Sequence, residues 1–139
     1  MGTLAHTTAD LVFVPQIDAD HQTLFAWLEK VREGAASGDP ATSPGLALWH
    51  LSKSLSAHFA GEERLMRRSE YDGFEWHQRQ HQTGRKRMAT LVEAVQSKNE
   101  QREQEALQQF EDWLKDHVAL ADRMFAAHLR NDLRTRAVS

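Results

Sequence analysis

The sequence predicts an all-α protein: an antiparallel up-down-up-down four-helix bundle with an N-terminal arm and a short C-terminal helical extension. Gly and Pro divide the 139 residues into four long segments in which apolar side chains recur every three or four positions. The connections between these segments are short, as in an antiparallel bundle. Hydrophobic residues make up 40% of the chain and charged residues 27%, which is typical of a globular domain.

The first two helices are predicted from their caps and their apolar stripes. Asp18 is placed as the N-cap of a helix over 18–36, and the stripe of this helix includes His21. After a loop, Ser43 would cap a second helix over 44–68. The stripe of the second helix steps by three and four throughout: Leu48, Leu51, Leu55, His58, Glu62 and Leu65. Two polar residues therefore lie in the middle of its inward face.

A break at Tyr71–Gly73 precedes a third helix over 74–97. Its inward stripe contains two more histidines and a glycine: Phe74, His77, His81, Gly84, Met88, Leu91 and Val95. The third stripe is therefore also partly polar.

The fourth helix opens near Asn99, and its stripe is regular as far as His117. Beyond His117 the regular spacing no longer gives the more apolar face. A shift of the stripe by one residue does, and it turns three residues inward: Asp122, Phe125 and Leu129. A π-type turn consumes one additional residue and often marks a functional site. We therefore expect one such turn after His117.

We assign residues 1–17 to the arm, 18–130 to the bundle and 131–139 to a C-terminal tail. The short apolar run Leu11–Val14 is expected to pack across one end of the bundle. With neither a signal-peptide pattern nor a long apolar run, we expect a cytoplasmic protein with no membrane partner. The 17 basic and 20 acidic residues give a net charge of -3, which argues against binding to nucleic acid.

The chain has no cysteine but eight histidines. The absence of cysteine excludes disulfides, thiolate catalysis and iron–sulfur clusters, so any metal must be held by His and carboxylate groups. Ligand-type residues lie on all four stripes: His21, His58, Glu62, His77, His81, His117 and Asp122. Burying these groups without partners would cost several kcal/mol per charge, against a total stability of about 5–15 kcal/mol. Two dications would compensate them.

These positions resemble a known family. Four stretches carry the resemblance, in this order: Ile17–Phe25; His58–Met66; Tyr71 with His77 and His81; and Trp113–Val118 with Asp122. Together they resemble the hemerythrins, in particular the single-domain bacteriohemerythrins.

The resemblance implies a non-haem di-iron site that binds O2 reversibly, for oxygen carriage, storage or delivery. One iron would be held by His77, His81 and His117, and the other by His21 and His58. Glu62 and Asp122 would bridge both irons alongside an oxo or hydroxo group. Family pocket positions imply an apolar O2 pocket lined by Leu24, Phe59, Trp113, Leu114 and Val118.

One departure from the family concerns Gly84, where relatives usually carry a bulky apolar side chain. We expect a wider cavity or a tunnel there, beside the three-histidine iron. His6, His50 and His128 lie outside the motif and are not expected to bind metal, and Glu63 is expected to face solvent.

Three alternatives remain open at this point. The same irons could serve an enzyme that reduces peroxide or oxidises a small molecule, an alternative that Gly84 supports. A sensor acting on a separate partner protein is the second alternative. The third is a structural bundle loaded with zinc, since zinc also takes His and carboxylate ligands.

Overall fold

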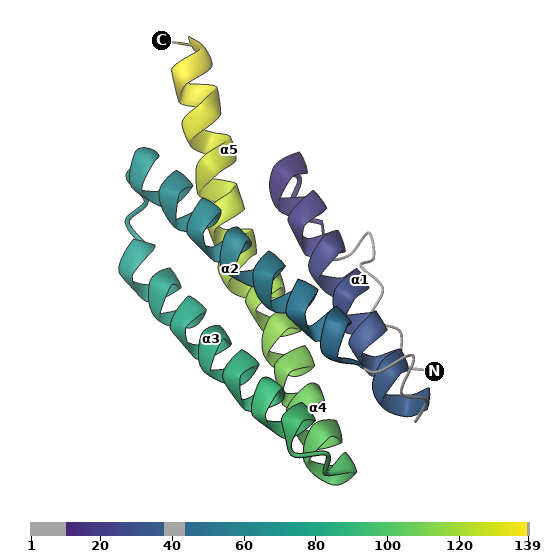
Figure 1. Ribbon diagram of the computed structural model, residues 1–139. Coiled ribbons are helices and arrows are strands. Elements are labelled where there is room, and N and C mark those ends of the chain that lie inside the picture. Colours follow the sequence, from purple (N-terminus) through teal and green to yellow (C-terminus); the bar gives the residue numbers. More distant parts are fainter. Residues whose placement is uncertain (1–10, 38–43, 139) are drawn as a thin grey trace.

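The computed structural model describes residues 11–37 and 44–138, and all regular structure within these ranges is helical (Figure 1). The elements are, in order, α1 (Pro15–Ser37), α2 (Pro44–Arg68), α3 (Phe74–Gln96), α4 (Glu100–His117), the π-helical turn η3 (Val118–Asp122) and α5 (Arg123–Val138). Consecutive long helices run in opposite directions, with α1 packed mainly on α2 and α3 on α4. The predicted antiparallel four-helix bundle is confirmed, with α4, η3 and α5 forming its fourth helix.

Helix α1 begins three residues earlier than predicted. Pro15 occupies its first turn, where the fixed φ of proline suits a helix and its missing N–H costs nothing. The predicted N-cap at Asp18 is wrong, because its Oδ1 accepts a hydrogen bond from the backbone N–H of Val12 at 2.8 Å. The loop containing the predicted Ser43 cap lies outside the described residues.

The described part of the arm packs against one end of the bundle, as expected. Val12 is buried in an apolar cluster with residues of α1, α2 and α5. Its carbonyl accepts a hydrogen bond from Arg130, and its N–H is bound by Asp18. The arm thus ties the start of α1 to α5.

The fourth helix starts where its sequence predicts. Asn99 is the N-cap of α4, and its Oδ1 accepts the backbone N–H of Arg102 at 3.1 Å. At the other end, residues 131–138, expected as a tail, continue helix α5. In Figure 1 this helix rises beyond the ends of α1, α2 and α3.

Two apolar clusters fill the bundle, and a polar layer separates them. The larger cluster includes Leu24, Leu28, Leu51, Phe59, Leu91, Phe110, Leu114 and Val118. The smaller cluster contains Val12, Ile17, Met66, Phe125, Ala126 and Leu129. Along α1, for example, His21 lies between Ile17 of the smaller cluster and Leu24 of the larger one. The predicted ligand residues therefore form a buried layer inside the bundle.

Candidate metal centre

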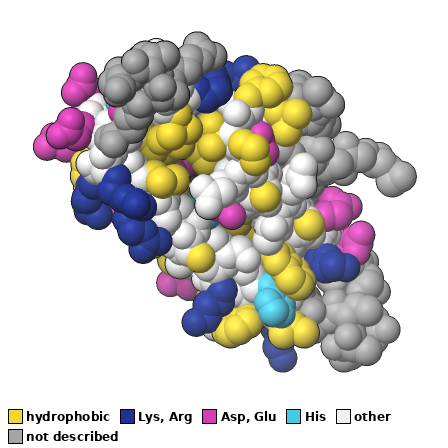
Figure 2. Space-filling model, turned by 90° about the horizontal axis from the view of Figure 1, so that it is seen from above, with side chains coloured by type: hydrophobic (Ala, Val, Ile, Leu, Met, Phe, Trp, Pro, Cys, Tyr) yellow, Lys and Arg dark blue, Asp and Glu magenta, His cyan; other side chains and the backbone are white. Residues whose placement is uncertain are grey.

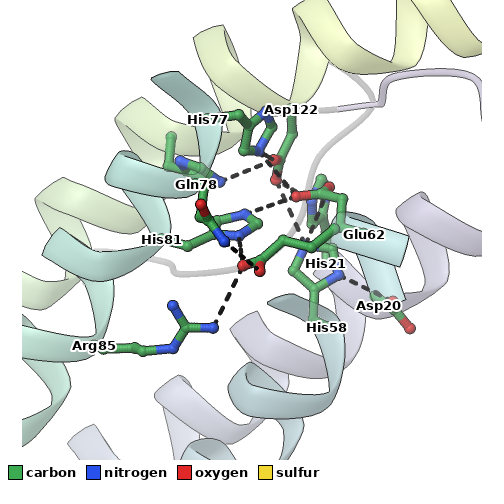
Figure 3. Close-up of polar contacts among 11 residues, drawn as sticks. Asp20, His21, His58, Glu62, His77, Gln78, His81, Arg85 and Asp122 are labelled. Carbon is green, nitrogen blue, oxygen red and sulfur yellow. Dashed lines mark hydrogen bonds and ion pairs between the residues drawn. The ribbon is translucent and has the colours of Figure 1, made fainter. Parts of the chain in front are cut away.

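Seven buried polar side chains meet in this layer, and Figure 3 labels all of them except His117. They come from every long helix and from the π-turn: His21, His58, Glu62, His77, His81, His117 and Asp122. Four of them have no exposed surface, and the other three expose 3–4%. The structure thus brings together all seven residues that the sequence marks as potential metal ligands.

Asp122 reaches the layer because of the π-turn. On a regular α-helix, five residues would leave Asp122 about 140° away from His117. Helix η3 spans Val118–Asp122 and absorbs the additional residue, so the Nε2 atom of His117 lies 2.9 Å from Oδ1 of Asp122. The predicted π-type turn is confirmed, and it also turns Phe125 into the smaller apolar cluster.

The donor atoms fall into two overlapping groups. One group contains Glu62, His77, His81, His117 and Asp122, and the other contains His21, His58, Glu62 and Asp122. Within each group, the donor atoms all lie within 4.8 Å of one another. Glu62 and Asp122 belong to both groups, so their carboxylates lie where they could bridge two ions. The chain therefore carries a His/Glu/Asp cluster able to bind metal.

The protein groups alone do not complete this layer. Nε2 of His58, Nε2 of His117 and Oε2 of Glu62 are buried and have no hydrogen-bond partner. These atoms nevertheless lie close to other donor atoms of the cluster. Nε2 of His58 is 3.5 Å from Oε2 of Glu62, and Nε2 of His117 is 2.9 Å from Oδ1 of Asp122. Each unsatisfied buried group costs about 1–3 kcal/mol. Cations between the donor atoms would satisfy them, and mixed imidazole and carboxylate donors suit iron and zinc.

Without metal, protons balance the charges of this layer. Burial acts to lower the pKa of His77, but hydrogen bonds and charges from Asp122 and Glu62 outweigh it and raise that pKa to about 9. Burial also acts to raise the pKa of Asp122, yet the charge of His117 and hydrogen bonds from the histidines hold it well below its usual value. Metal binding requires neutral imidazoles, so it would displace these protons.

Two further carboxylates hold the outer sides of the histidine rings. Oε2 of Glu63 lies 2.8 Å from Nδ1 of His81, and Oδ2 of Asp20 lies 3.0 Å from Nδ1 of His58. Glu63 also accepts hydrogen bonds from Gln78 at 3.3 Å and Arg85 at 3.4 Å. A carboxylate on the second ring nitrogen fixes the tautomer and orientation of a metal-bound histidine.

The expectation that Glu63 faces solvent is therefore wrong: only 8% of this residue is exposed. It lies one residue after Glu62 and so points about 100° away around α2. That direction leads towards α3, where Nδ1 of His81 contacts the Glu63 carboxylate. The sequence shows two adjacent glutamates, which is a possible signal of a second functional carboxylate. It does not show that α3 packs against the side of α2 that carries Glu63.

Comparison with known families settles the relationship of the chain. The model of the Hemerythrin HHE cation binding domain matches residues 12–129. The chain belongs to the hemerythrin family. The family resemblance of the sequence is thereby confirmed, and the His/Glu/Asp cluster able to bind metal lies within the matched cation-binding domain.

A solved structure is similar to this hemerythrin-family chain over most of its length. It is a crystal structure of a leucine-to-phenylalanine mutant, with 25% identity and a TM-score of 0.78. The match covers 93% of this chain and 98% of the other. No curated protein matches the chain.

Aromatic rings cover the three-histidine side of the cluster. The ring of Phe59 stacks on His81 with centroids 4.1 Å apart, and Trp113 stacks on His117 at 4.7 Å. The cavity expected beside Gly84 is not there: a Cβ at Gly84 would lie 2.3 Å from the Trp113 indole. The glycine makes room for this ring, so the expectation of a wider cavity is wrong.

The five residues expected to line an O2 pocket lie close together. Leu24, Phe59, Leu114 and Val118 are at most 1% exposed and belong to the larger apolar cluster. Trp113 packs against that cluster. Apolar side chains therefore lie beside the histidine layer, since Phe59 stacks on His81 and Trp113 on His117.

Histidines outside the motif have other partners. His50 stacks on Trp27 with ring centroids 4.2 Å apart, and Nε2 of His128 lies 2.9 Å from the carbonyl oxygen of Ser69. Neither residue belongs to a group of potential ligands. His6 lies outside the described residues.

The surface provides no single basic patch on the face seen in Figure 2, where Lys and Arg side chains lie in separate groups among acidic and apolar ones. Of the helices in the described ranges, none combines the length and apolar character that crossing a membrane requires.

Proposed function

We propose that this chain binds O2 reversibly at a non-haem di-iron centre and serves oxygen carriage, storage or delivery. The observation that carries the proposal is the pair of overlapping donor groups that share Glu62 and Asp122. His77, His81 and His117 would hold one iron, and His21 and His58 the other, with both carboxylates as bridges alongside an oxo or hydroxo group.

The asymmetry of the donors supports binding of a small molecule. Three histidines would hold one ion and two would hold the other, which would leave the second ion a place for an external ligand. When bound, two ferrous ions supply the electrons that O2 accepts. Five neutral imidazoles and two carboxylates form a donor set with fewer anions than a carboxylate-rich di-iron site, which favours release of O2 unchanged over its further activation.

The apolar residues around the cluster fit this role because they exclude water. Leu24, Leu114 and Val118 have exposed fractions of 1%, and Phe59 has none. An apolar wall of this kind withholds the water and protons that would assist oxidation of ferrous iron. The enzyme alternative drew its support from an expected space beside Gly84, and Trp113 fills that space.

The test is the visible spectrum of the anaerobically reduced chain before O2, after O2 and after purging with argon, with iron measured on the same sample. A band that appears with O2 and disappears on purging, with two irons per chain, supports the proposal. An irreversible ferric spectrum within the mixing time contradicts it. Zinc in place of iron in protein purified from its natural source would also contradict it.

A further inference from the structure

A groove between α2 and α3 lies outside the metal centre. It has a volume of about 410 Å³. Pockets that bind small molecules usually measure about 300–1,000 Å³, so the groove is large enough for a ligand of modest size. None of the seven potential metal ligands belongs to its lining. The groove is therefore a separate feature of the molecule.

The walls of the groove are mainly apolar. Two side chains of α2 and three of α3 form them: Leu55, Phe59, Met88, Ala89 and Val92. Leu55, Phe59 and Met88 are buried and form its floor, whereas Ala89 is exposed. A hydrocarbon chain laid along this floor would remove apolar surface from water, which is favourable for binding.

The groove carries opposite charges at different points along α3. Arg85 and Glu93 both line it, and eight residues of helix separate them by about 12 Å. This separation is close to the extended length of octanoate. An anionic group is attracted by Arg85 and repelled by Glu93, so the charges give an anionic ligand one orientation. Ser52 and Ser56 add hydroxyl groups on the α2 side.

The guanidinium of Arg85 can pair with a further anion. It lies over the Phe59 ring, 5.1 Å from the centroid, and 46% of the Arg85 side chain is exposed. Among the described residues, its one hydrogen bond runs from Nη2 to Oε2 of Glu63 and is long, at 3.4 Å (Figure 3). A guanidinium offers five N–H donors in one plane and binds a carboxylate through two parallel hydrogen bonds.

The same arginine connects the groove to the metal centre. Its partner Glu63 lies 2.8 Å from Nδ1 of His81, and Phe59 stacks on that ring. An anion paired with Arg85 would neutralise a positive charge beside the cluster and release Glu63 to act on His81 alone. Weaker repulsion of cations and a more basic imidazole both favour metal binding.

We propose that this groove binds a small amphipathic acid, and that an occupied groove strengthens metal binding by the cluster. The carboxylate of the ligand pairs with Arg85, and its single hydrocarbon chain lies along the apolar floor towards Glu93. A lipid with two acyl chains is too large for the groove. The site does not rest on the proposed function, because none of its residues is a potential metal ligand.

The experiment titrates octanoate, well below the concentration at which it forms micelles, into the full chain in a calorimeter. The metal-free and zinc-loaded forms are both measured. One octanoate is expected to bind per chain, and octanol and octylamine should bind at least about tenfold more weakly, because they lack the charge that Arg85 recognises. Acetate has the carboxylate without the chain and should give no heat, which excludes direct coordination to the metal.

Two variants test the groove, each with a matched control on α3. Ala89→Phe fills the groove and should abolish binding, whereas Thr90→Phe places the same ring at an exposed position outside the lining. Arg85→Gln should weaken binding at least about tenfold. Arg87→Gln removes the same charge from an exposed position outside the lining. Both controls should keep the dissociation constant within about twofold of that of the unaltered chain.

The connection to the metal centre is tested by reciprocity. If octanoate strengthens metal binding, the zinc-loaded chain must bind octanoate more tightly than the metal-free chain by the same factor. We expect at least about a threefold difference, and equal dissociation constants would overturn the connection.

The binding site itself is overturned by any of three results. These are no binding of octanoate, binding of octylamine as tight as that of octanoate, or unchanged affinity in both Arg85→Gln and Ala89→Phe. Sedimentation velocity tests a different occupant: a dimer of the unaltered chain that Ala89→Phe dissociates would show that a second copy covers the groove, against the proposal. Failure of the proposed function is recognised separately, as absence of a reversible O2 band in the iron-loaded chain.

Discussion

The imidazole of His81 lies between two glutamates that are adjacent in sequence: its Nε2 atom is 2.9 Å from Oε1 of Glu62, and its Nδ1 atom is 2.8 Å from Oε2 of Glu63. One residue could act as a metal ligand and its neighbour orients the ring that would bind the same metal. Two helices thereby fix a single histidine from both sides.

Glu63→Gln should weaken metal binding, because the amide no longer offers a charged acceptor to Nδ1–H of His81. Loss of such an outer partner typically lowers metal affinity about 10–100-fold. Titration against a competing chelator measures the change. Asp112→Asn removes a charge from an exposed site on α4 and should have no effect. Equal affinities of the two variants would contradict the role of Glu63.

Asp20→Asn should weaken metal binding less than Glu63→Gln does. Asp20 also contacts a histidine of the cluster, but its side chain is 55% exposed, compared with 10% for Glu63. Water competes for hydrogen bonds at exposed sites and can replace the lost acceptor. The same chelator titration compares the two variants, and a larger loss for Asp20→Asn would show that exposure does not decide the effect.

His58→Ala should empty the two-histidine position and leave the three-histidine position loaded, because His58 belongs to only one donor group. His50→Ala should leave metal content intact, since His50 stacks on Trp27 and belongs to neither group. Metal analysis of purified protein checks both outcomes. A reversal of the two results would rule out the ligand assignment.

The metal-free chain should lose stability as the pH rises from about 6.5 to about 9. The pKa of His77 is raised from 6.5 to about 9 in the fold, so its protonated form stabilises the folded state fully below 6.5. This contribution, about 3 kcal/mol, disappears as the pH rises through the folded-state pKa. Urea unfolding at several pH values measures it.

The metal-loaded chain should behave in the opposite way over the same range. Metal binding requires neutral histidines, so the affinity for metal, and with it the stability of the loaded fold, rises with pH. At acidic pH both forms lose stability. The pKa values of Glu62 and Asp122 are lowered in the fold, so their ionised forms stabilise the folded state, and this stabilisation is lost as the two carboxylates are protonated. Parallel pH profiles of the loaded and metal-free chains above pH 6.5 would contradict this account.

Gly84→Ala should destabilise the fold, although alanine favours helices by about 1 kcal/mol. The added Cβ would lie 2.3 Å from the Trp113 ring, and overpacking of this kind costs about 1–3 kcal/mol. Gly61→Ala is the matched control: it meets only Arg64 at 3.9 Å and should stabilise α2. Urea unfolding of both variants, with Trp fluorescence as the readout, separates a steric effect from helix propensity.

The sequence was sufficient to predict much of the fold and to identify the seven buried side chains that meet in one cluster. Stripes with a helical period predicted the four helices, and the broken stripe after His117 predicted the π-turn of η3. These features are local, so they can be read from spacing alone.

The errors concern contacts between elements that spacing does not specify. Nothing in the order of residues shows that Glu63 would meet His81 of α3, or that the Trp113 ring would fill the space beside Gly84. Helix α1 begins at Pro15, before Asp18, because Asp18 has the chemistry of an N-cap but accepts a hydrogen bond from Val12 of the arm instead. Each error involves a residue whose partner belongs to another segment of the chain.

The contact between His21 and Asp122 joins residues 101 positions apart, with Nε2 and Oδ2 separated by 2.7 Å. Forming it closes a loop of 101 positions in a chain of 139 residues, and the entropy of that closure must be overcome before one ion can bind both donors. A nascent chain carries no complete set of donors until Asp122, at the end of η3, has been synthesised. The complete set of donor atoms therefore exists only in the folded chain, and metal binding and folding are coupled.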